Sequence, residues 1–141
     1  MKNYVFNSSI LCKTSDGNQI PKYKLVVKGE QYDMYCYNEK KQEYHIVSLY
    51  NKYLLCHLDY LLKNNQDRIQ RYLNKGKLYK YLKEVDRRAR QCVDQQVERL
   101  QHTNQEWLTA HEKGDIFTEI GLTNNFIAQA EEIINSTIIY V

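Results

Sequence analysis

The sequence has little proline or glycine, with one proline and five glycines in 141 residues. This scarcity argues against a disordered chain and against a fold made mainly of loops. No run approaches the roughly 18 apolar residues of a membrane helix, and residues 1–8 contain no long apolar core or cleavage site. We therefore expect a soluble, cytoplasmic protein with no membrane segment, long enough to bury a core without added cross-links.

Metal-binding and catalytic motifs are also missing. The cysteines Cys12, Cys36, Cys56 and Cys92 form no close pair, and the histidines are equally scattered. A zinc site usually contains at least two ligands close together in the sequence. The neighbours Cys56 and His57 would point about 100° apart on a helix, and no glycine-rich phosphate loop is present. We predict reduced thiols, no metal, no cofactor and no catalytic residues, and hence a protein that is not an enzyme.

The sequence does contain a marked separation of charge. Residues 63–90 carry ten basic and three acidic side chains, a balance of 10 − 3 = +7. Residues 91–141 carry two basic and eight acidic side chains, a balance of 2 − 8 = −6. A basic segment beside an acidic one indicates a nucleic-acid surface, an acidic protein partner, or packing of the two segments on each other.

The first third of the chain, residues 1–47, has the alternation of β-strands. Aromatic and β-branched residues alternate there with polar ones, and turn sequences that contain Gly17 or Gly29 separate the runs. This pattern predicts a three- or four-stranded antiparallel meander. The predicted strands are residues 10–13, 23–27, 31–37 and 43–47.

Residues 48–141 change to helical spacing. A stripe of four leucines predicts a first helix, and residues 66–73 continue as a short second helix. Gly76 then stops the helix, because glycine adopts the left-handed conformation without steric cost. The leucines of the stripe are Leu54, Leu58, Leu61 and Leu62.

A long antiparallel helical hairpin is predicted next, with helices at 77–112 and 115–136. Apolar residues in both recur at alternating spacings of four and three, and Gly114 lies between the two helices. The first helix would be about 54 Å long at about 1.5 Å per residue. Since this is long for a monomer of this size, we expect a homodimer through the long helices. The predicted fold class is α+β, one compact domain with a β-meander, a short helix pair and the hairpin.

The basic side chains fall on the helices that flank Gly76. They recur at helical spacing, opposite most of the apolar face of the long helix. Lysine and arginine on a rigid helix suit phosphates, because each neutralised phosphate releases condensed counterions. The candidate nucleic-acid-binding residues are Arg68, Arg71, Lys75, Lys77, Lys80, Lys83, Arg87 and Arg90. A solvated helix face, or attraction to the acidic last helix, explains the same pattern.

Tyrosine is abundant, with thirteen in the chain. Tyr32, Tyr35, Tyr37 and Tyr44 on the predicted strands are candidates for a partner-binding surface, since tyrosine supplies a large contact area at low entropic cost. The alternative interpretation is that these rings pack the sheet against the helices.

Parts of the sequence resemble a known family. Residues 72–86, YLNKGKLYKYLKEVD, are similar to the "sGKLy.hL.eiD" segment of TnpV-type transposon-encoded proteins, and residues 121–140 resemble that family's "G..NN…AeEiv…liY" ending. Residues 15–25 resemble its N-terminal strand, whereas residues 26–53 are extra tyrosine-rich sequence. Ile127 stands where the family has an arginine, which weakens the case for DNA contacts from the last helix.

The resemblance implies a mobile-element protein with an accessory role on DNA and without catalytic residues. Our first hypothesis is a non-enzymatic accessory protein of a mobile element or prophage that binds the DNA backbone through its basic helical face. The alternative is a protein-binding modulator, such as an anti-defence (anti-CRISPR-like) inhibitor that blocks a nucleic-acid-binding host complex. The expected partner is therefore DNA or a host protein complex of this kind.

Overall fold

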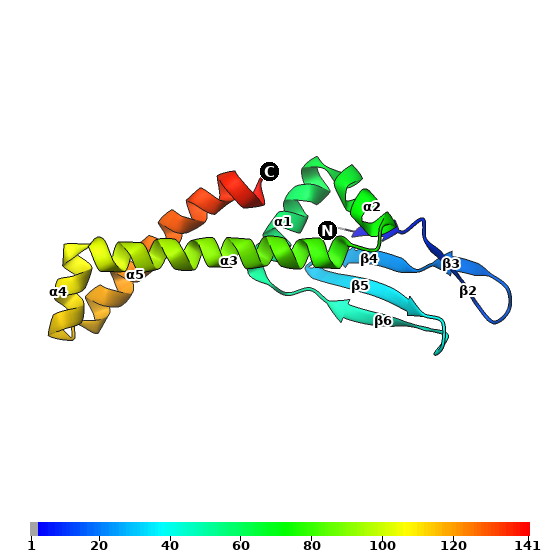
Figure 1. Ribbon diagram of the computed structural model, residues 1–141, viewed down its shortest axis with the longest axis horizontal. Coiled ribbons are helices and arrows are strands. Elements are labelled where there is room, and N and C mark those ends of the chain that lie inside the picture. The colour runs from blue at the N-terminus through cyan, green and yellow to red at the C-terminus, as the bar shows by residue number, and fades with distance from the viewer. Residues whose placement is uncertain (1–2) are drawn as a thin grey trace. The chain divides into compact units, whose positions relative to one another are not determined.

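A computed structural model describes residues 3–141 and confirms the α+β class (Figure 1). The strands end at Ser48 and the first helix begins at Lys52, so the change from strands to helices lies close to its predicted position. The chain divides into two compact units, Met1–Glu84 and Val85–Val141, which meet within helix α3 (Leu78–Thr103).

The first unit contains a four-stranded antiparallel sheet with the order β1-β4-β5-β6. The central and last strands form the predicted meander, because the tight turn at Gly29 and the turn after Asn38 connect neighbouring strands. The first strand was not predicted, and it pairs with β4 from a distant part of the sequence. The strands are β1 (Asn3–Asn7), β4 (Tyr23–Lys28), β5 (Gln31–Asn38) and β6 (Glu43–Ser48).

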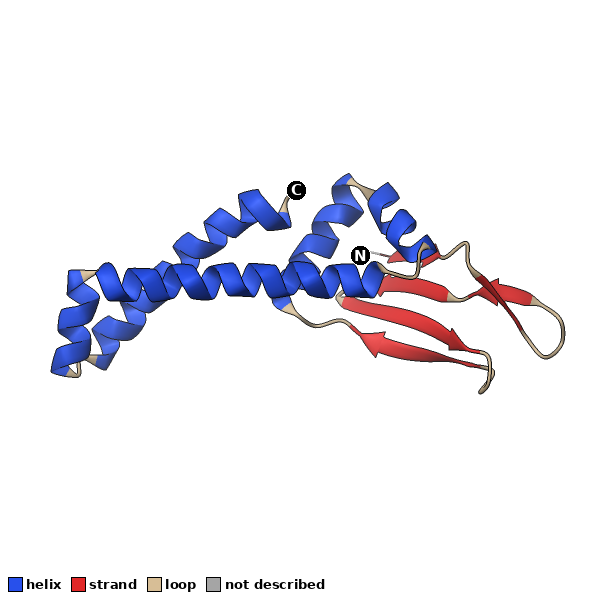
Figure 2. Cartoon of the chain, in the orientation of Figure 1, coloured by secondary structure: helices blue, strands red, loops and turns tan. Residues whose placement is uncertain are grey.

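The predicted strand at 10–13 belongs to a separate hairpin, not to the meander. Strands β2 (Leu11–Lys13) and β3 (Gln19–Pro21) pair only with each other and are drawn as a two-stranded ribbon in Figure 2. The turn between them contains Gly17 with a φ of 88°, a conformation that suits glycine. This local turn pairs the two short strands with each other.

Helices α1 (Lys52–Asn64) and α2 (Gln66–Asn74), with the first turns of α3, cover one face of the large sheet (Figure 1). The four leucines of the predicted stripe are all buried in this core, as predicted. Leu25 and Val27 of β4 meet them from the sheet, two residues apart and therefore on the same face. Burial of this apolar surface is the main stabilising contribution in the first unit.

In the second unit, the predicted single helix at 77–112 is wrong, because the chain breaks at Asn104. Helix α3 ends at Thr103, and α4 (Gln105–Lys113) begins two residues later. Asn104 has an extended ψ of 114°, and its side chain accepts a hydrogen bond from the Trp107 backbone N–H. An asparagine that satisfies a helix N-terminus in this way favours a new helix over continuation of the old one. The 26 residues of α3 span about 39 Å rather than 54 Å.

Helix α5 (Ile116–Ile134) returns after Gly114, and a π-helical turn, η1 (Asn135–Ile139), follows it. Ala130 and Ile134 in the last two turns of α5 are buried, but Ile116 and Ile120 at its start are exposed. The apolar spacing predicted for this helix therefore corresponds to buried positions near its end but not at its start. In residues 3–141, no helix combines the length and apolar character needed to cross a membrane.

Candidate nucleic-acid interface

The turn between α2 and α3 is built around Gly76, whose φ of 69° is left-handed. The Lys77 N–H donates to the Tyr72 carbonyl at 2.9 Å, and the Gly76 N–H donates to the Leu73 carbonyl at 3.0 Å. This pair of bonds satisfies carbonyls that the end of α2 would otherwise leave open. A Cβ atom at Gly76 would lie 2.7 Å from the Tyr23 ring, so the turn rests directly on strand β4.

Five basic side chains of the first unit are exposed around this turn. Leu73, Leu78 and Leu82 are buried on the opposite side of the same helices, which fixes the direction in which the basic side chains point. The structure therefore brings together five of the eight predicted residues, here called the basic face. The basic face consists of Arg71, Lys75, Lys77, Lys80 and Lys83.

The other three predicted basic residues have different surroundings. Arg68 is half-buried in α2. Arg90 lies in the second unit, where its Nε is 2.8 Å from Oδ2 of Asp86, a side chain only 2% exposed. Arg87, also in the second unit, donates from Nη1 to Oε1 of Gln91 at 3.0 Å. The charge of Arg90 is thus neutralised by a carboxylate in its own helix.

A pocket of about 410 Å³ adjoins the basic face, and no pattern in the sequence predicted it. Its wall includes Tyr79 and Lys80 from the first turn of α3, and its floor is mostly apolar. Cys36 and His45, which face each other across β5 and β6, also line it. Its residues come from three strands and two helices, so no single stretch of sequence carries a signal for it.

The four candidate tyrosines do not form one surface. Tyr32 is buried in the core, and its hydroxyl hydrogen-bonds to Asp59. The other three are grouped by ring contacts, with centroids 5.8 Å apart for Tyr35 and Tyr44 and 5.0 Å apart for Tyr37 and Tyr44.

The side chains of these three tyrosines are partly buried. The Tyr44 hydroxyl donates to the Pro21 carbonyl at 2.6 Å, and burial raises the pKa of both Tyr37 and Tyr44. Tyr37 is itself buried, whereas Tyr35 and Tyr44 are half-buried. At these positions the structure favours sheet packing over a broad aromatic contact surface.

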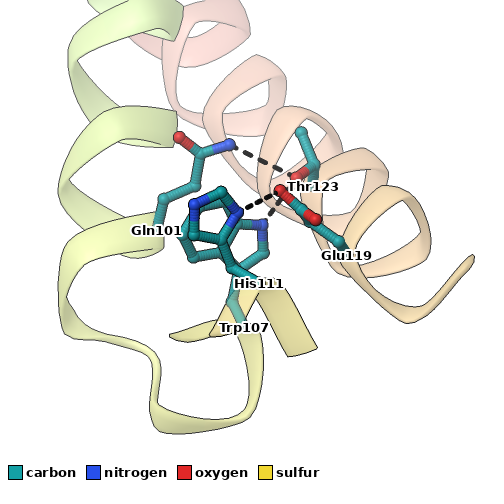
Figure 3. Close-up of polar contacts among 5 residues, drawn as sticks. All are labelled: Gln101, Trp107, His111, Glu119 and Thr123. Carbon is teal, nitrogen blue, oxygen red and sulfur yellow. Dashed lines mark hydrogen bonds and ion pairs between the residues drawn. The ribbon is translucent and has the colours of Figure 1, made fainter. Parts of the chain in front are cut away.

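The second unit contains a polar cluster where α3, α4 and α5 meet (Figure 3). The Thr123 hydroxyl oxygen accepts from the Trp107 indole at 3.0 Å and from the Gln101 amide at 3.3 Å. The Trp107 ring stacks on His111 at 4.9 Å between centroids, and His111 Nδ1 lies 2.8 Å from Oε1 of Glu119. These contacts connect α3, α4 and α5 to one another. In residues 3–141, no three histidine, cysteine or acidic side chains are placed to hold a metal ion.

Comparison with known proteins identifies one family. The sequence model of the family described as "Transposon-encoded protein TnpV" matches residues 37–139, which is more than half of the chain. The matched region contains β6 and the described helices, including the whole basic face. It begins at residue 37, so the expectation that residues 26–53 are extra sequence is wrong for residues 37–53. Residues 15–25, which resemble the family's N-terminal strand, lie outside it. No curated protein and no solved structure matches the chain.

Proposed function

The chain belongs to the TnpV family of transposon-encoded proteins, and we propose that it acts as a mobile-element accessory protein that binds the DNA backbone through the basic face. The observation that carries this proposal is the exposure of five basic side chains around one rigid turn. The buried leucines behind the turn fix the backbone that carries these side chains before any partner arrives. Such preorganisation lowers the entropic cost of binding.

The chemistry of the basic face favours phosphates over base edges. Lysine ammonium groups and the Arg71 guanidinium are strong donors to phosphate oxygens, and the first turn of α3 adds backbone N–H groups at a positive helix end. The exposed residues on the first two turns of α3 are Tyr79, Lys80, Lys83 and Glu84, which include no asparagine or glutamine to pair with adenine. Binding with little sequence preference follows from this arrangement.

Salt dependence is the direct test of backbone binding. If all five cations neutralise phosphates, the logarithm of the association constant should fall against the logarithm of salt concentration with a slope of about −4 to −5. The measurement is fluorescence anisotropy with a labelled duplex over a series of potassium chloride concentrations. A flat response would exclude the proposed mode of binding.

Charge reversal then locates the interface. The double variant Lys80→Glu/Lys83→Glu should weaken duplex binding and reduce the magnitude of the salt slope by about 2, one for each lost phosphate contact. The matched control is Lys40→Glu/Lys41→Glu, which makes the same change in net charge at exposed positions after β5. Equal losses in both double variants would mean that only the total charge matters and would overturn the assignment to the basic face.

We also propose that the protein is a homodimer, with an exposed apolar patch on α5 as the contact. Phe117 is 91% exposed, and Ile116 and Ile120 beside it are 62% and 53% exposed. Removing such surface from water contributes about 25 cal/mol per Å². The variant Phe117→Ser should therefore shift sedimentation equilibrium toward the monomer, while its far-ultraviolet circular dichroism stays unchanged. A wild-type protein that remains monomeric at all concentrations would rule the dimer out.

A further inference from the structure

The pocket beside the basic face has the composition of a site for a flat, partly apolar group. Met34, Val47 and Leu78 supply apolar surface, and Tyr23 and Tyr79 supply aromatic rings. Within the described residues, the side chains that line it include no carboxylate. Its volume of about 410 Å³ lies within the usual range for small-molecule and cofactor sites.

Two lysines, Lys80 and Lys83, connect this pocket to the basic face. Lys80 belongs to both, because it is exposed on α3 and lines the pocket. The Lys83 ammonium lies 5.2 Å from the centre of the Tyr79 ring, in cation–π geometry. This contact holds an aromatic wall of the pocket next to two cations. A ligand that fills the pocket can therefore carry negative charge on the side that faces the helices.

We propose that the pocket receives one unpaired base of a DNA strand whose phosphates lie on the basic face. This inference rests on the proposed DNA binding and adds the class of DNA that is preferred. The base would lie against the Tyr79 ring, with the neighbouring phosphate near Lys80. The His45 imidazole, which also lines the pocket, offers a hydrogen bond to the edge of the base.

The energetics favour DNA that is already unpaired. A base inside a duplex is stacked and paired, so moving it into a protein pocket costs free energy, and this cost is least for a bulged or single-stranded base. Stacking of a base on an aromatic side chain is tolerant of sequence, because every base has a π-face. A preference for bulged over paired DNA, without strong base specificity, is the expected result.

The test compares two labelled duplexes that differ only in one bulged 2-aminopurine nucleotide. Wild-type protein should bind the bulged duplex about tenfold more tightly than the paired one, and stacking should quench the 2-aminopurine fluorescence. Equal affinity for both duplexes would overturn the pocket assignment while leaving backbone binding intact. Loss of binding to both duplexes would instead count against the proposed function itself.

Three variants test whether the preference for the bulged duplex depends on the pocket. Tyr79→Ala should remove the preference for the bulged duplex, whereas Tyr79→Phe, which keeps the ring, should retain it. Val47→Phe, on the edge strand β6, should fill the pocket and also remove the preference. Each variant is first tested against the paired duplex, which reports any loss of folding or of the basic face. If the bulged duplex is preferred equally by all three variants, the base lies elsewhere and the proposal is wrong.

Discussion

Replacement of Trp107 by alanine is expected to lower the free energy of unfolding by about 3–5 kcal/mol, the usual cost of removing a large buried aromatic side chain. Trp107 is only 9% exposed and donates to Thr123, while its ring covers His111. These contacts join α4 to α5, so their loss should weaken the packing of α4 on α5 after the helix break at Asn104. Urea unfolding followed by circular dichroism at the helical band measures the change.

The variant Trp107→Phe separates the two contributions of this side chain. Phenylalanine keeps an aromatic ring beside His111 but has no N–H group, so the Thr123 hydroxyl loses one donor. A loss of about 1 kcal/mol is expected for one neutral hydrogen bond. The smaller phenyl ring adds a packing loss, and the total should stay below the loss in Trp107→Ala. If both variants lose the same stability, the indole N–H and the second ring, both absent from phenylalanine, dominate, and the ring that phenylalanine keeps contributes little.

Local patterns predicted most of the secondary structure. Strands β4, β5 and β6 were expected at 23–27, 31–37 and 43–47 and are found within one residue of those limits, because their alternation and turns are local features. Strand β1 was missed because it is defined by pairing with β4, sixteen residues beyond its own end. Pairing between distant segments produces no pattern in the sequence of either segment alone.

The break at Asn104 shows a different limit. Apolar residues continue at near-helical spacing from Val97 through Leu100 to Trp107, so periodicity predicted one helix. Asparagine is only moderately unfavourable inside a helix, but as an N-cap it stabilises a new helix start. The choice between these two roles depends on the contacts that Trp107 makes with α5, which the sequence does not reveal.

The candidate site was predictable in its charge but not in its extent. The basic segment and its stop at Gly76 were visible in the sequence. The ion pair between Arg90 and Asp86 was not visible in the sequence. An acid at position i and a base at i+4 give the same sequence pattern whether the acid is buried or exposed. The pocket was also hidden, since its walls come from strands and helices that only the fold brings together.

Replacement of Gly76 by alanine is expected to cost about 2–5 kcal/mol of stability, from two additive causes. A left-handed backbone with a Cβ atom costs roughly 1–2 kcal/mol, and the close contact of the new Cβ with the Tyr23 ring costs about 1–3 kcal/mol more. The φ of Gly76 is 69°, and the new Cβ would lie 2.7 Å from Cε2 of Tyr23. Urea unfolding measures the sum.

Gly29→Ala is the matched control for the backbone contribution alone. Gly29 lies in the same unit with a φ of 59°, and no atom lies within 4 Å of a Cβ placed there. It should lose only about 1–2 kcal/mol, so any excess in Gly76→Ala measures the contact with Tyr23. The double variant Gly76→Ala/Tyr23→Leu should recover part of that excess.

Equal losses at the two glycines would mean that the Tyr23 ring moves aside without cost, and the turn would then not depend on β4. An excess would show that the sheet itself fixes the turn carrying Lys75 and Lys77, so that stability and DNA affinity should fall together in Gly76→Ala but not in Gly29→Ala.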